Sequence, residues 1–186
     1  LKNKYENLKT KLNSLDDIYH QLKQKVRILD INNSNINRAE QLFNKTNQFN
    51  FSTNRYNKNQ LTSIKNKKNT IIKLLSLSDK FGDHGIIGSY ICIHQKNCII
   101  VSDFMLSCRI LSRKIEEYVI YLILKENKNK DVYLRHIKTD KNKELIKIFL
   151  ENNHFKKVNI KIITKLKGEL YKVLLNKRLN NVKKFF

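Results

Sequence analysis

The chain has 186 residues, of which 40% are apolar, enough for one domain with its own hydrophobic core. Its formal charge of +22 would suit nucleic acid, yet Pro and Trp are absent while Lys, Asn and Ile dominate. This bias is typical of an A/T-rich genome, and the lysines are scattered singly, so we expect no nucleic-acid partner.

The sequence also argues against membrane insertion and secretion. No apolar run approaches the ~18 residues that span a bilayer, and the first residues do not resemble a secretory signal. The chain begins without Met, so we expect a fragment of a longer protein. Its three cysteines, Cys92, Cys98 and Cys108, fit neither a disulfide framework nor a zinc spacing. A cytoplasmic protein without a metal site is therefore expected.

The first third of the chain predicts mostly helix. Apolar residues at three- and four-residue steps indicate a helix over residues 1–24, followed by an alternating strand over 26–31. An Asn-rich turn precedes a second helix over 36–47. The polar segment after it predicts a loop with a short helix near 59–65.

The middle of the chain predicts three consecutive strands, over 70–78, 86–94 and 98–106. The stretch 82–85, which reads G-D-H-G, is expected to be a turn, and 95–97 a tight connection. Connections this short cannot form crossovers, so the strands should make an antiparallel meander.

The last part of the chain returns to alternating helix and strand. A helix is predicted over 112–127, a strand over 132–137 and a helix over 144–152. A hairpin-like pair of strands is predicted over 158–164 and 169–175.

The order of these elements predicts an α+β fold, an α/β/α sandwich with a mixed, mainly antiparallel sheet. The strand–helix–strand unit that follows the meander requires a parallel crossover. This order is similar to that of the GNAT acyltransferases, whose fourth and fifth strands part to admit a pantetheine arm.

Four stretches carry a more specific resemblance. Residues 38–50 read R-A-E-Q-L-F-N-K-T-N-Q-F-N, and residues 79–88 read D-K-F-G-D-H-G-I-I-G. Residues 104–111 read F-M-L-S-C-R-I-L, and 139–142 read T-D-K-N ahead of Phe149 and Phe155. Between roughly residues 26 and 160, their order and spacing resemble the FkbH-like (HAD-IIIC) family, which joins a haloacid-dehalogenase-type phosphatase domain to a GNAT-like carboxy-terminal domain.

This resemblance implies a division of the chain and an activity. Residues 1–24 would be a helical linker from a missing phosphatase-type domain, whose D-x-D-x-T motif is absent here, and 25–186 the GNAT-like domain. Family members are associated with transfer of a glyceryl unit from a phosphorylated glycolytic donor to an acyl carrier protein. The implied co-substrate is the phosphopantetheine arm of that carrier, or acyl-CoA, with no tightly bound cofactor. The implied partners are the carrier protein and the phosphatase-type domain.

The candidate catalytic residues are Cys108, His84 and Asp83. Cys108 lies where a strand ends and a helix is predicted to begin, next to Arg109, and both features favour a thiolate nucleophile. His84, between flexible residues, would be the general base, with Asp83 orienting its ring. The alternatives are a buried core cysteine and a surface turn.

The candidate substrate-binding residues are polar side chains beside these: Asn47, Gln48, Asn50, Arg109, Arg113, Thr139 and Asn142. The amides of the first three suit the hydroxyl or carbonyl groups of a small acyl unit, unless they only end a helix. Thr139 and Asn142 would flank the pantetheine slot or cap a helix.

A phosphate is expected at Arg109 and the loop that follows it. GNAT proteins bind the pyrophosphate of coenzyme A with R-x-x-G-x-G, and here Ser112 and Lys114 replace the glycines. Arg113 and Lys114 would supply side-chain charge instead. A carrier-bound phosphopantetheine, with one phosphate, suits this loop better than coenzyme A. The remaining hypotheses are a conventional GNAT acetylating an amine from acetyl-CoA and a non-catalytic docking or nucleic-acid module.

Overall fold

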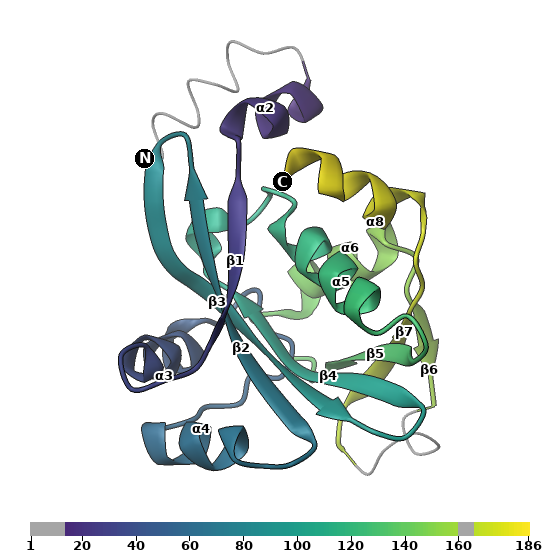
Figure 1. Ribbon diagram of the computed structural model, residues 1–186. Coiled ribbons are helices and arrows are strands. Elements are labelled where there is room, and N and C mark those ends of the chain that lie inside the picture. The colour runs from purple at the N-terminus through teal and green to yellow at the C-terminus, as the bar shows by residue number, and fades with distance from the viewer. Residues whose placement is uncertain (1–13, 160–165) are drawn as a thin grey trace.

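The computed structural model of the chain describes residues 14–159 and 166–186. Its strands form one sheet in the order β1-β2-β3-β4-β5-β7-β6 (Figure 1). These strands are β1 (Lys25–Asp30), β2 (Thr70–Asp79), β3 (Gly82–His94), β4 (Cys98–Leu106), β5 (Asp131–His136), β6 (Lys156–Val158) and β7 (Glu169–Val173). The helices are α2 (Leu15–Leu22), α3 (Ile36–Lys45), α4 (Lys58–Lys65), α5 (Ile115–Glu126), α6 (Lys143–Asn152) and α8 (Lys177–Val182). Short 3-10 helices cover Cys108–Ile110 and Lys183–Phe185.

The predicted α+β architecture is confirmed. Strands β2, β3 and β4 form the antiparallel meander, and β4 pairs with β5 in parallel across the α5 crossover. The predicted helix over 1–24 is seen as α2, residues 1–13 lying outside the described part. The second strand of the last hairpin is β7, whereas much of its predicted partner also falls outside that part. Helix α8 was not predicted; Asn176 caps it by accepting a hydrogen bond from the N–H of Leu179.

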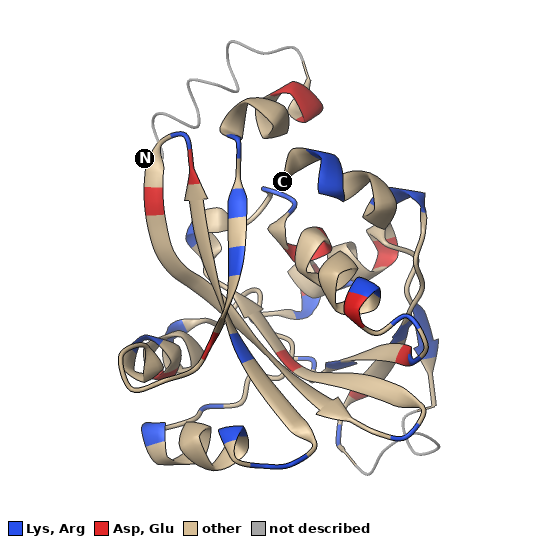
Figure 2. Cartoon of the chain, viewed as in Figure 1, with Lys and Arg blue, Asp and Glu red and all other residues tan. Residues whose placement is uncertain are grey.

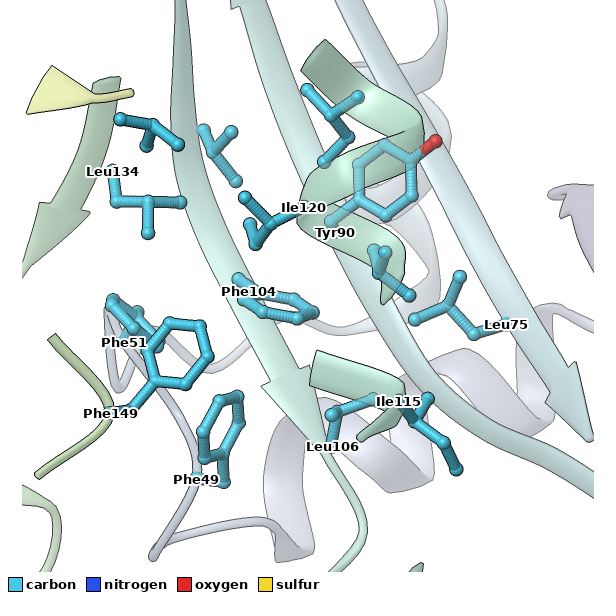
Figure 3. Packing of buried hydrophobic residues seen from close by; sticks show 14 of the residues in the cluster. Phe49, Phe51, Leu75, Tyr90, Phe104, Leu106, Ile115, Ile120, Leu134 and Phe149 are labelled. Atoms are coloured by element: carbon cyan, nitrogen blue, oxygen red, sulfur yellow. The ribbon is translucent and has the colours of Figure 1, made fainter. Parts of the chain in front are cut away.

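The sheet separates two apolar layers because neighbouring residues of a strand point to opposite faces. In β4, Phe104 packs into the layer under α5 and α6, while Met105 packs into the layer under α3 and α4. Phe49, Phe51 and Phe149 gather beside Phe104 in the first layer (Figure 3). The two layers hold the ends of β4 and β5 in fixed positions, and the candidate site lies there.

The stretch 82–85 is part of β3 rather than a turn, so that prediction was wrong. The turn lies at residues 80–81, between the paired residues Asp79 and Gly82. The N–H of Phe81 donates to Oδ1 of Asp79 at 2.8 Å. Between β2 and β3 the register shifts twice, leaving Ile87 and His84 as extra residues in β3. A bulge of this kind changes the direction of the local side chains, and it sets that of His84.

The helix predicted from residue 112 begins three residues later. Ser112 and Lys114 have φ angles of 64° and 65°, in the left-handed region, so the backbone there is not helical. Such angles cost a residue with a side chain roughly 1–2 kcal/mol. Both are held by the contacts described below.

Lys and Arg are spread over both layers and along several strands (Figure 2). Within residues 14–159 and 166–186, no helix is both long enough and apolar enough to cross a bilayer.

Candidate functional site

The strands β4 and β5 part near the middle of the sheet. β4 has a register shift opposite Ile91 and Cys92, which leaves Ser102 without a partner on β3. The parallel pairing with β5 ends beside this bulge, at Val101 and Leu134. Beyond it the two strands are no longer paired, as the similarity of the element order to GNAT acyltransferases implied.

The gap between the diverging strands is filled by the chain itself. The N–H of Phe51 donates to the carbonyl of Phe104 at 2.9 Å, and the N–H of Leu106 donates to the carbonyl of Phe49 at 3.0 Å. On the β5 side, the N–H of Ile137 donates to the carbonyl of Phe51 at 2.7 Å. The inserted segment, residues 49–51, therefore occupies the space in which a pantetheine arm was expected.

Two predicted substrate-binding amides hold the inserted segment in place. The side chain of Asn142 donates to the carbonyl of Asn50 at 2.8 Å and to that of Ile137 at 2.9 Å. Its oxygen accepts from the N–H of Thr139 at 2.8 Å. The side chain of Asn50 donates to Thr46 and accepts from backbone N–H groups of the following turn. Both asparagines are fully buried, so their amides support the backbone and do not face a substrate.

A pocket of 740 Å³ opens at the end of β4. It lies between α3, the inserted segment and the turn before α6. Three predicted site residues line it: Cys108, Asn47 and Gln48. Cys108 is exposed, whereas the other two described cysteines are buried. The structure thus brings together one candidate nucleophile and two candidate polar contacts.

The walls of this Cys108 pocket are basic. Arg38, Lys45 and Lys141 line it, and Asp140, its acidic residue, pairs with Lys143 at 2.9 Å. Burial and, to a smaller extent, the charge of Arg109 lower the pKa of Arg38. Two guanidinium groups this close favour an anion near them. The sequence analysis did not predict a role for these three basic side chains. All of them belong to the motif stretches 38–50 and 139–142, so the family resemblance could have pointed to them.

His84 lies outside the Cys108 pocket. Its Nε2 atom is 2.8 Å from Oδ2 of Asp79, and Nη1 of Arg113 is 2.9 Å from the same oxygen. All three side chains are at most 6% exposed. The structure therefore places the His84 ring in a buried ionic cluster and shows no contact between it and the Cys108 sulphur.

Asp83 and Arg113 also differ from their predicted roles. Asp83 is exposed, and its carboxylate accepts from the N–H of Gly85 at 2.7 Å. The carboxylate that contacts the His84 ring, and so orients it, is that of Asp79 and not that of Asp83. Arg113 is turned inward to Asp79 and does not offer its charge to a phosphate. Arg109 remains at the surface, where it donates to the carbonyl of His84 at 2.9 Å.

The loop before α5 keeps a glycine-like backbone without glycines. The hydroxyl of Tyr19 donates to the carbonyl of Ser112 at 3.1 Å, and the side chain of Gln24 donates to that of Arg113 at 3.2 Å. A trans peptide points its C=O and its N–H in opposite directions. The N–H of Arg113 therefore points away from Tyr19, and the N–H of Lys114 points away from Gln24. This backbone resembles an anion cradle.

The side chains at the start of α5 do not suit an anion. Glu116 and Glu117 occupy its first turn and line a second pocket of 220 Å³. Glu117 is buried and pairs with Lys114 at 3.1 Å and Arg178 at 2.7 Å. Burial and then the charge of Glu117 raise the pKa of Glu116 to about 7. Two carboxylates where a pyrophosphate would bind fit coenzyme A poorly. In the sequence the pair Glu116-Glu117 follows the third motif stretch, 104–111, but it was given no role in the predicted site.

Solved structures resemble this chain in fold although their sequences differ. An acetyltransferase of the GNAT family from Staphylococcus aureus Mu50 superimposes with a TM-score of 0.57 at 17% identity, over 80% of this chain and 98% of that one. The chain has the GNAT fold. The PaiA N-acetyltransferase from Thermoplasma acidophilum, in complex with coenzyme A, gives a TM-score of 0.55 at 13% identity, over 81% of this chain and 99% of that one.

A domain from Methanocaldococcus jannaschii DSM 2661 gives a TM-score of 0.60 at 16% identity, over 82% of this chain and 99% of that one. No protein-family model and no curated protein sequence matches the chain. At these identities the likeness shows the GNAT fold alone.

The raised pKa of Glu116 predicts how stability changes with pH. The folded chain holds the Glu116 proton up to about pH 7, whereas the unfolded chain releases it near 4.5. Stability contributed by protonated Glu116 is therefore lost as pH rises from about 4.5 to about 7. Glu116→Gln should be the more stable protein at pH 8, by about 2–3 kcal/mol, and equal to the parent near pH 4.5.

Urea unfolding across this pH range measures the difference. The charges around Glu116 are Glu117 on the same helix, Lys114 on the loop and Arg178 on α8, and all remain in the variant. Glu151→Gln, on the exposed side of α6, is the matched control and should show no such pH dependence. A Glu116→Gln effect that is constant with pH would contradict the shifted pKa.

Proposed function

We propose that this chain transfers a small acyl group through a thioester on Cys108. The observation that carries the proposal is the exposed Cys108 sulphur in the wall of a basic pocket of 740 Å³. A thiol with access to a pocket can form a covalent intermediate, which the buried Cys92 and Cys98 cannot. The GNAT fold of the chain supports acyl transfer as the reaction class.

The proposed acyl unit is a glyceryl group, and the proposed acceptor is the phosphopantetheine thiol of an acyl carrier protein. Asn47 and Gln48 line the Cys108 pocket and offer amides for the hydroxyl groups of such an acid. Arg38, Lys45 and Lys141 offer positive charge for the phosphate of the arm or of the donor. The resemblance to FkbH-like proteins supports the same assignment, with a phosphatase-type domain as partner.

The proposed acyl transfer takes two steps. In the first, the Cys108 thiolate attacks the carbonyl of an acyl phosphate; a C–S bond forms, the C–O bond breaks, and phosphate leaves. In the second, the pantetheine thiol attacks the Cys108 thioester; a new C–S bond forms, the bond to Cys108 breaks, and the thiol proton passes to Cys108. Both steps need the Cys108 sulphur to be accessible. The residue after it, Arg109, donates through its side chain to the carbonyl of His84.

Intact-mass measurement after incubation with glyceryl-S-phosphopantetheine tests the proposal. This donor runs the second step in reverse, so the phosphatase-type domain is not needed. We expect a mass increase of one glyceryl unit on the parent chain and on Cys98→Ala, the matched control. Cys108→Ala should show none. A parent chain without adduct, or an adduct that persists in Cys108→Ala, rejects the proposal.

A second candidate is N-acyl transfer from acetyl-CoA. It is favoured by the backbone of the loop before α5, where Ser112 and Lys114 keep the left-handed angles of a glycine-containing cradle. The carboxylates of Glu116 and Glu117 and the inserted segment oppose it. Calorimetry with coenzyme A distinguishes the two: submicromolar binding supports the second candidate, and absence of binding supports Cys108 chemistry.

A further inference from the structure

The second pocket, lined by Glu116 and Glu117, has a chemistry different from that of the Cys108 pocket. It lies between α5, α6 and α8 and measures 220 Å³. Its apolar wall comes from five side chains: Phe49, Leu111, Leu145, Ile148 and Phe149. At about 30 Å³ for each water-sized group, it holds roughly seven such groups, the size of a small organic molecule.

Three buried oxygen atoms of this pocket's side chains lack a hydrogen-bond donor within the described chain: Oε2 of Glu116, Oε2 of Glu117 and Oδ1 of Asn153. Glu117 is 2% exposed and Asn153 is 1% exposed. All three atoms are acceptors when the carboxyl groups of Glu116 and Glu117 are ionised. A buried acceptor left without a donor costs about 1–3 kcal/mol, so three in one pocket indicate a ligand that supplies donors.

Three donor groups beside these oxygens bind other acceptors. Lys114 and Arg178 both bind Oε1 of Glu117, at 3.1 Å and 2.7 Å. The side-chain nitrogen of Asn153 donates to the carbonyl of Phe149 at 2.9 Å. These contacts leave the three oxygens unpaired and leave the carboxylate of Glu116 without an ion pair among the described residues.

We propose that this pocket binds a small primary amine in its ammonium form. An ammonium group carries three N–H donors, matching three acceptors, and its charge suits the unpaired carboxylate of Glu116. A short alkyl stem suits the apolar wall. An anion would meet two carboxylates, and a quaternary ammonium would bring charge without donors. The proposal does not depend on the function proposed for Cys108.

Ligand-dependent thermal unfolding tests it, with n-propylamine hydrochloride as the probe. Tetramethylammonium chloride and KCl at equal ionic strength are the controls for charge alone. We expect a saturable rise in melting temperature with n-propylamine and none with either control. Equal rises with tetramethylammonium, or no saturable rise with n-propylamine, overturn the proposal; in the second case the three oxygens bind water.

Variants place the ligand in the pocket. Glu116→Gln removes the unpaired carboxylate without breaking an ion pair of the described chain, and it should weaken n-propylamine binding about tenfold, roughly 1.4 kcal/mol. Glu151→Gln, exposed on α6, should bind as the parent does. Each variant is compared with its own ligand-free midpoint because Glu116→Gln is itself expected to be stabilised. Unchanged affinity in Glu116→Gln would place the amine elsewhere and overturn the assignment.

Discussion

Replacing Asp79 by alanine is expected to lower the free energy of unfolding by about 3–5 kcal/mol. The carboxylate is fully buried and lies within 2.9 Å of both His84 and Arg113, and it also accepts from the N–H of Phe81. Without it, the guanidinium of Arg113 stays buried with no counter-charge from Asp79. For a chain of this length the melting temperature should fall by about 10 °C.

Asp83→Ala removes the same charge four residues away from an exposed site and should cost less than about 1 kcal/mol. The double variant Asp79→Leu with Arg113→Met removes both charges and should recover part of the loss, because both buried charges are replaced by apolar side chains. Thermal and urea unfolding measure all three proteins. An Asp79→Ala loss no larger than that of Asp83→Ala would show that the cluster contributes little.

Asn142→Ala is expected to destabilise the fold by roughly 3–4 kcal/mol. The change leaves the carbonyls of Asn50 and Ile137 and the N–H of Thr139 without their Asn142 partner, at about 1–3 kcal/mol for each buried group. The loss should appear first where the inserted segment meets β5. Hydrogen exchange of the Ile137 amide should accelerate more than that of amides in the centre of β3.

Asn142→Asp is the matched control, because it keeps an oxygen for the N–H of Thr139 and removes the two donors. It should lose most of the stability that Asn142→Ala loses and accelerate the same amide. Protection of Ile137 that is unchanged in both variants would mean that Asn142 does not hold the inserted segment.

The sequence predicted the order and type of nearly all elements because hydrophobic periodicity is a local property. β4 was predicted with its observed bounds, and the structure buries all nine of its residues. The stretch 82–85 was misplaced because Gly and Asp favour turns, whereas pairing of Gly82 with Asp79 and a two-residue turn took precedence. Helix α8 is short and lacks a clear period, so its local signal is weak.

The candidate site was only partly predictable. Cys108, Asn47 and Gln48 come from segments some sixty residues apart, and a shared motif resemblance pointed to all of them. The direction of a side chain depends on tertiary contacts, which the sequence does not show. His84 is turned by a bulge towards Asp79, which follows the predicted strand over 70–78 and opens the motif stretch 79–88 but was given no role in the site.

Filling of the gap between β4 and β5 has a thermodynamic consequence for anything that binds there. A molecule inserting between these strands must displace residues 49–51 and break four hydrogen bonds, three between backbone groups and one from Asn142. At about 1 kcal/mol each, this exchange weakens the observed affinity by roughly 4 kcal/mol, or about a thousandfold. A ligand that binds in the Cys108 pocket, at the end of β4, does not have to displace residues 49–51.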